Sequence, residues 1–226
     1  MEKEFYSKSD VIEYVWQYSR YHGNLLSYCE QIAKEDSSNA RNGFAALIFL
    51  LNLTENILKD RIKNYDANLI NVINELKNQG LITQTEYTFL NDRNNSIRRL
   101  RNLLAHANLS KYNLVFIEEG REILYPLTEN ETCIKLYEMF SGILFNLMLR
   151  IISVNFIKPF EINLDDKIKN LEINIKELTP EELLELKGVD VSGVPTWKEL
   201  SEIDRYRLAE NTSDVNMYLE IFKRLF

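Results

Sequence analysis

The sequence predicts a mainly helical protein, an antiparallel helical bundle with an inserted β-hairpin and a helical C-terminal extension. Its 226 residues include only 7 glycines and 4 prolines. So few backbone breakers disfavour a β-sandwich with many turns and favour long helices. Apolar residues also recur at intervals of three and four along most of the chain, which is the period of an α-helix. A hydrophobic content of 45% supplies a core and excludes general disorder.

Five helices are expected in the N-terminal part of the chain, with approximate ranges 9–34, 39–62, 66–78, 83–106 and 132–154. Ser38 or Asn39 is expected to cap the second helix, which is apolar on all sides from 44 to 51 and so begins in the core. Gly80 is expected to end the third helix. Thr83 and Glu86 have the spacing of a capping box, which opens the fourth helix.

The sequence changes character at Tyr112. Two apolar segments, 112–117 and 123–125, flank Glu118-Glu119-Gly120. This pattern predicts a β-hairpin at about 112–126, and it is the only clear strand signal in the chain.

The C-terminal part is expected to be an acidic helical extension. Residues 161–190 contain nine acidic and four basic residues. Thr179-Pro180 predicts the start of a short helix, residues 196–199 have the spacing of a capping box, and a last helix is expected over 214–226. The sequence therefore divides into a helical domain, 1–157, which contains the hairpin, and an extension, 158–226.

Composition excludes several classes of function. The net charge is 27 − 34 = −7, so the protein as a whole is not attracted to nucleic acid. The two cysteines, Cys29 and Cys133, have no metal-site or disulfide spacing. Residues 1–4 do not begin a signal peptide, and the longest apolar run, 44–51, is far short of the roughly 20 residues that span a bilayer. A cytoplasmic protein that uses no membrane, metal or cofactor is expected, and the lack of a Gly-rich phosphate loop disfavours a kinase.

One segment has a net charge opposite in sign to that of the whole chain. Between residues 91 and 111 there are five basic residues and one acid, Asp92, for a local net charge of +4; the basic residues are Arg93, Arg98, Arg99, Arg101 and Lys111. On a helical wheel, Leu90, Ile97, Leu100 and Leu104 form a core stripe. An ideal helix separates Arg101 from His106 by about 140°. Either the helix ends or distorts at 105–106, or a site that uses both side chains is built from two chains.

The segment Arg101-Asn102-Leu103-Leu104-Ala105-His106 resembles the motif of the HEPN superfamily. Many of those helical domains carry an arginine, a polar residue directly after it and a histidine four to six positions beyond the arginine. The resemblance covers about 9–155 and implies a metal-independent endoribonuclease, usually a homodimer with its two motifs facing each other. The RNA 2′-hydroxyl then attacks the adjacent phosphorus and leaves a 2′,3′-cyclic phosphate. Some relatives carry a tyrosine two residues after the histidine, where this chain has Asn108.

The resemblance assigns a role to each residue of the motif. His106 would be the general acid or base, because histidine exchanges protons near neutral pH. Arg101 would stabilise the charge of the phosphorane, and Asn102 would orient His106 or bind the sugar-phosphate. The residues expected to follow the RNA backbone are Arg98, Arg99 and Lys111.

Structural roles remain open for the same residues. His106 fits a cation at a helix C-terminus, and the arginines fit a solvated face paired with acids. For Glu55, a structural salt bridge to an arginine of the fourth helix is favoured over a catalytic role. His22 is expected to be packed or at the surface.

Three functions follow. The first is a HEPN-type ribonuclease that acts as a toxin or an antiphage defence effector, with RNA as substrate. The second is a non-catalytic helical module that binds RNA, a nucleotide or a partner protein. The third is one half of a toxin–antitoxin pair, in which the acidic segment 161–190 covers the basic helix.

Overall fold

A computed structural model describes residues 5–34, 36–37, 40–118, 121–153, 160–171, 173–193 and 196–213. The protein is mostly helical, with ten α-helices and two small antiparallel sheets in this part of the chain. It forms two compact units. The first comprises Met1–Ala107 and Glu129–Asn174, and the second comprises Asn108–Thr128 and Ile175–Phe226.

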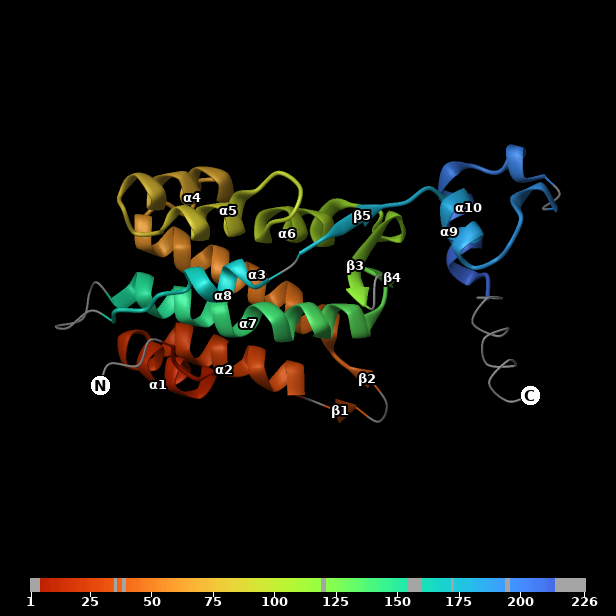
Figure 1. The fold of residues 1–226 in the computed structure, drawn as a ribbon. Coiled ribbons are helices and arrows are strands. Elements are labelled where there is room, and N and C mark those ends of the chain that lie inside the picture. The colour runs from red at the N-terminus through yellow and green to blue at the C-terminus, as the bar shows by residue number, and fades with distance from the viewer. Residues whose placement is uncertain are drawn as a thin grey trace. The chain divides into compact units, whose positions relative to one another are not determined.

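The first unit is a helical bundle. Two long helices, α3 (Gly43–Ile62) and α7 (Asn130–Ser153), pack against each other in its middle, as Figure 1 shows. The helices α1 (Lys8–Tyr18) and α2 (Arg20–Lys34) lie on one side of this pair. The remaining helices of the unit are α4 (Leu69–Asn78), α5 (Gln84–Asn91), α6 (Ile97–His106) and α8 (Asp165–Lys169).

Helix α7 supplies much of the core. Its side chains Tyr137, Phe140 and Phe145 are among the largest that are fully buried. Within the described residues, α7 is long and apolar enough to cross a membrane by length and composition, but 78% of its most apolar window is buried in the protein. A core helix passes the same test, and the contacts of α7 with α3 and α1 identify it as one.

The predicted helix over 9–34 is wrong, because it is two helices. Ser19 has an extended backbone, with φ −147° and ψ 111°. Its Oγ accepts a hydrogen bond from the amide of His22 at 3.3 Å, which caps the start of α2. The chain folds back at this point, and Gly23 packs so closely on α1 that a Cβ would lie 2.5 Å from the Cα of Trp16.

The predicted helix over 83–106 is also two helices. The capping box at its start is confirmed, since Thr83 and Glu86 bond reciprocally. The helix stops at Asn91, because Asp92 Oδ1 accepts hydrogen bonds from the amides of Asn94 and Asn95, each at 2.8 Å. These local bonds replace the helical ones, and a new helix begins after Ser96.

The start of the second predicted helix lies later than expected. Short strands β1 (Asp36–Ser37) and β2 (Ala40–Arg41) pair with each other before α3. Helix α3 begins at Gly43, and its N-cap residue Asn42 makes no side-chain capping bond. A Cβ at Gly43 would lie 2.1 Å from the carbonyl oxygen of Asn130, so this glycine lets α3 meet the start of α7.

The second unit is built on a three-stranded antiparallel sheet of order β4-β3-β5. The predicted hairpin is confirmed as β3 (Tyr112–Glu118) and β4 (Arg121–Pro126), with Leu114 opposite Tyr125. The third strand, β5 (Ile175–Glu177), was not predicted. The other elements of the unit are η1 (Leu109–Lys111), α9 (Pro180–Leu186), η2 (Val191–Gly193), η3 (Trp197–Glu199) and α10 (Glu202–Asn211).

A small core holds the helices of the second unit together. Leu184, Trp197 and Ala209 are buried in it. The predicted start of α9 is confirmed, with a capping box from Thr179 to Glu182. The predicted capping box at 196–199 is wrong, because Thr196 has φ +64° and makes no capping bond.

The two units do not meet at the predicted domain boundary, which lies between residues 157 and 158. Strand β5 pairs with β3, so the hairpin and most of the C-terminal segment share one unit, while 160–171 belongs to the helical bundle. The last predicted helix, 214–226, lies outside the described residues.

Candidate functional site

Helix α6 carries the whole candidate motif. Its N-cap residue, Ser96, accepts a hydrogen bond from the amide of Arg99 at 3.2 Å and donates one to the carbonyl oxygen of Asp92 at 2.7 Å. Ile97, Leu100 and Leu103 are buried and attach the helix to the bundle. The helix ends at His106, because Ala107 is extended. Both ends of this ten-residue helix are therefore set by local bonds and by its apolar face.

Arg101 is bound by a carboxylate of another helix. Its Nη2 lies 3.0 Å from Oε2 of Glu55 on α3, and the Glu55 side chain is only 8% exposed. Oε1 of Glu55 lies 2.8 Å from Nζ of Lys59. The salt bridge expected between Glu55 and an arginine of the fourth helix is thus confirmed.

The Glu55–Arg101 contact is an ion pair without a hydrogen bond. Within the described part of the chain, Glu55 Oε2 and Arg101 Nε are buried atoms that lack a hydrogen-bond partner. The guanidinium donates instead to Oδ1 of Asn102, at 3.3 Å. The Arg101 side chain remains 28% exposed, so a ligand can still reach it.

His106 and Asn102 are both exposed. His106 lies in the last turn of α6, four residues after Asn102, so the two share a face of the helix. Arg101 lies about 140° away from His106 around the helix axis. The predicted end of the helix at 105–106 is confirmed, but α6 is regular up to that point and one copy does not turn both side chains towards one phosphate.

The three residues expected to follow an RNA backbone are not equally placed. Arg98 donates from Nε to Oδ1 of Asn91 at 2.5 Å, and Arg99 is half-buried. Lys111 belongs to the second unit. There it binds Glu202 at 2.5 Å and lies 5.1 Å from the centre of the Tyr206 ring. The hydrogen bond to Glu202 raises the pKa of Lys111.

Sequence reasoning missed Lys59 as a member of the cluster. The signal was present, because Glu55 and Lys59 are four residues apart on one helix, the spacing of a stabilising pair. The two residues, together with Arg101, form what we call the Glu55 cluster.

Other chemistries find little support. Among the described residues no three His, Cys, Asp or Glu side chains gather as metal ligands. Cys29 and Cys133 are buried, and burial raises the pKa of each thiol to about 12, which makes them poor nucleophiles. His22 is buried as well, so of the two expected roles, packed or at the surface, it has the packed one.

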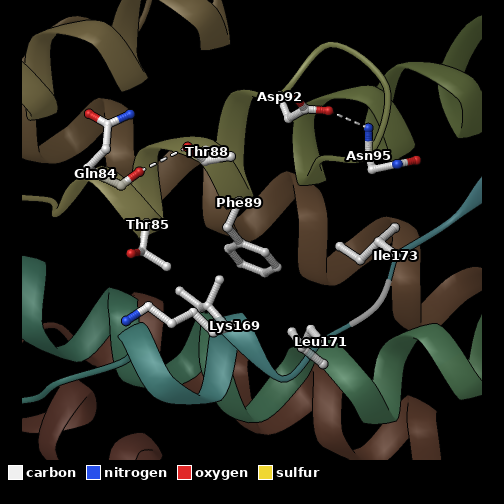
Figure 2. A pocket seen from close by; sticks show the side chains of 10 residues that line it. Gln84, Thr85, Thr88, Phe89, Asp92, Asn95, Lys169, Leu171 and Ile173 are labelled. Atoms are coloured by element: carbon white, nitrogen blue, oxygen red, sulfur yellow. Dashed lines mark hydrogen bonds between the residues drawn. The ribbon is translucent and has the colours of Figure 1, made fainter.

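A surface groove of about 600 Å³ lies next to α5 and α8. Its lining includes the apolar side chains of Phe89, Leu171 and Ile173 and the polar ones of Asp92 and Asn95, which Figure 2 shows. The acidic segment begins nearby, since Asp165 accepts a hydrogen bond from Thr83 Oγ1 at 2.7 Å. The motif residues on α6 do not line this groove, so it is a separate feature.

No family model, no curated protein and no solved structure matches this chain.

Proposed function

We propose that this protein is a metal-independent endoribonuclease of the HEPN type, and that α6 carries its catalytic residues. The observation that carries the proposal is the placement of the motif on one short helix, with an exposed His106 at its end and Arg101 set against a buried carboxylate. An exposed imidazole and a partly exposed guanidinium are the groups that phosphodiester cleavage needs.

The reaction forms one bond to phosphorus and breaks another. The 2′-oxygen of the RNA attacks the adjacent phosphorus as its proton leaves, and the bond to the 5′-oxygen breaks as that oxygen gains a proton. The products are a 2′,3′-cyclic phosphate and a 5′-hydroxyl. His106 transfers a proton, Arg101 stabilises the additional charge of the phosphorane, and Asn102 orients the imidazole or binds the sugar-phosphate.

A homodimer completes the site. Two proton transfers are needed, and α6 turns Arg101 and His106 to different sides. A two-fold axis that brings two copies of α6 together supplies two imidazoles and two guanidiniums around one strand. In this proposal Arg98 and Arg99 contact the RNA backbone, whereas Lys111 belongs to the second unit and is bound there to Glu202.

The biological setting follows from the same resemblance. A cytoplasmic ribonuclease of this size would act as a toxin or an antiphage defence effector, held in check by an antitoxin or another partner protein.

One observation favours a second candidate, the non-catalytic binding module. Arg101 is already paired with Glu55, and a neutralised arginine binds phosphate less strongly. In that case the exposed face of α6 would bind RNA or a partner protein without cleaving it.

Cleavage of RNA in EDTA separates the two candidates. A 5′-labelled RNA is incubated with the purified protein, and the ends of the products are identified. We expect cleavage to a cyclic phosphate by the wild-type protein, and none by His106→Ala or Arg101→Ala. The matched control is Arg93→Ala, which removes an exposed arginine of the same basic segment. Salt-dependent binding of RNA without cleavage would favour the binding module, and full activity of His106→Ala would refute the ribonuclease.

A further inference from the structure

Glu55 has a position that an ordinary surface salt bridge does not have. It lies on α3 among buried residues, and its carboxylate is 8% exposed. A buried charge is costly unless it is paired. Its two partners are Lys59 on the same helix and Arg101 on α6, so one carboxylate connects the core helix to the motif helix.

The Glu55 carboxylate shares its two oxygens between two cations. Lys59 lies at Oε1 of Glu55, and Arg101 lies at Oε2. Arginine binds a carboxylate most strongly when it contacts both oxygens, and here Lys59 occupies the oxygen that Arg101 does not contact. The contact of Arg101 with Oε2 lacks a hydrogen bond. Glu55 thus fixes the guanidinium by charge, while the Arg101 side chain remains 28% exposed and accessible to a phosphate.

We propose that Glu55 is a positioning residue, which holds Arg101 against α3 in the orientation that receives the scissile phosphate. Lys59 has the complementary role of keeping Glu55 from binding Arg101 through both oxygens. This inference rests on the proposed ribonuclease function. It adds to the motif two residues of α3, and it assigns to neither of them a contact with the RNA.

The inference predicts different kinetic effects for variants of the two residues, on kcat for Glu55 and on KM for Lys59. Glu55→Gln keeps the size of the side chain and removes the charge, so Arg101 loses its fixed position. We expect kcat to fall by about 10- to 100-fold, the loss typical of a catalytic group misplaced by about 1 Å. KM for RNA should not rise, because a negative charge near the phosphate is gone. Lys59→Met frees both carboxylate oxygens for Arg101, so KM should rise.

The experiment measures kcat and KM on a short RNA in EDTA, together with the thermal unfolding temperature. The matched control is Glu30→Gln. Glu30 is also a buried carboxylate paired with a lysine, Lys8, at 2.6 Å, but it lies on α2. A purely structural role predicts that both glutamine variants lower the unfolding temperature and keep kcat. Glu55→Asp, which keeps the charge on a shorter side chain, should have a kcat between those of the wild type and Glu55→Gln.

Each outcome of this experiment either supports or overturns the inference. A fall of kcat in Glu55→Gln alone, partly restored in Glu55→Asp, supports the inference. Wild-type kcat in Glu55→Gln overturns it and leaves the ribonuclease standing, whereas a wild-type protein that cleaves no RNA overturns both. If Glu55→Gln does not fold, Lys59→Met provides the test, and an unchanged KM in that variant overturns the inference.

Discussion

Arg101 and His106 lie on the same helix, five residues apart, and occupy different sides of it. Arg101 meets Glu55 of α3, whereas His106 is exposed at the C-terminal end of α6. Because α6 is regular between them, they are about 140° apart around its axis. In the proposed ribonuclease, a second copy of the helix would therefore supply one of the two groups that contact the phosphodiester.

Mixing two inactive variants tests this arrangement. Arg101→Ala and His106→Ala are each expected to be inactive as homodimers. A mixed dimer keeps one arginine and one histidine, on different copies, so one of the two arginine–histidine pairs that face each other across the axis is intact. We expect mixtures that exchange subunits to recover up to about a quarter of the wild-type rate, measured as RNA cleavage in EDTA.

Two controls accompany the mixing experiment. The double variant Arg101→Ala/His106→Ala mixed with either single variant should stay inactive, because no site then holds both groups. Size-exclusion chromatography must show that the variants are dimers. Dimers that exchange subunits without any recovery would mean that both groups act within one copy.

The two histidines of the chain are expected to separate stability from activity. His22 is buried, its Nδ1 has no hydrogen-bond partner in the described part of the chain, and burial lowers its pKa, with Asp60 opposing the shift. The folded state thus binds the proton less readily than the unfolded state, whose histidine has a pKa of about 6.5. The contribution of His22 to the free energy of unfolding should be constant above that pH and should fall as the pH drops below it.

Replacement of His22 tests whether this histidine makes the protein less stable at acidic pH. The free energy of unfolding of His22→Leu is measured with denaturant between pH 5 and 8, a range that brackets about 6.5. We expect it to fall less at acidic pH than that of the wild type. His106→Ala should change the stability little, because His106 is exposed. The same acid-side loss in His22→Leu as in the wild type would contradict a neutral, buried His22.

The sequence determined most elements but not their interruptions. Periodic apolar residues identified the helical segments, because burial of one face sets that period. The breaks at Ser19 and at Asp92–Ser96 depend on single side chains that bond to the backbone. Such residues also occur inside helices, so their pattern alone does not distinguish a break from a continuous helix. Strand β5 has three residues and forms only because β3 offers an edge, which no local pattern records.

The candidate site was predictable in composition and less so in geometry. The charge reversal and the spacing of the motif identified α6, and Glu55 was expected to reach an arginine of that helix. Which arginine it reaches depends on how α3 and α6 pack against each other, and the sequence pattern of either helix alone does not show this. The place of Lys111 was missed for a similar reason, since its partner Glu202 is distant in sequence.

The N-cap of α6 is expected to affect activity as well as stability. Ser96 is buried, and its hydroxyl both caps α6 and bonds the carbonyl of Asp92. Ser96→Ala should lower the free energy of unfolding by about 1–2 kcal/mol, and it should lower RNA cleavage because the end of the motif helix loosens. Thr179→Ala removes the N-cap of α9 in the other unit and is the control. Equal cleavage by the two variants would show that the cap of α6 does not support the site.

A buried ion pair fixes the elements that precede α6. Arg150 of α7 binds Glu86 of α5 at 2.5 Å, and the Glu86 side chain is fully buried. The guanidinium also donates to the carbonyl oxygens of Leu81 and Ile162, each at 3.2 Å. Arg150 therefore connects α7 to the start of α5 and to the segment that leads into α8.

Removal of Arg150 leaves a buried carboxylate without its cation. Arg150→Met should lower the free energy of unfolding by about 3–5 kcal/mol, measured by urea denaturation. The double variant Arg150→Met/Glu86→Gln should regain part of that loss, because the unpaired charge is gone. Lys169→Met removes an exposed ion pair of the same unit, 3.8 Å from Asp166, and should change stability by less than about 1 kcal/mol. If Arg150→Met were as mild as Lys169→Met, the pair would not be what holds α5, and the position of α6 would depend on its apolar face alone.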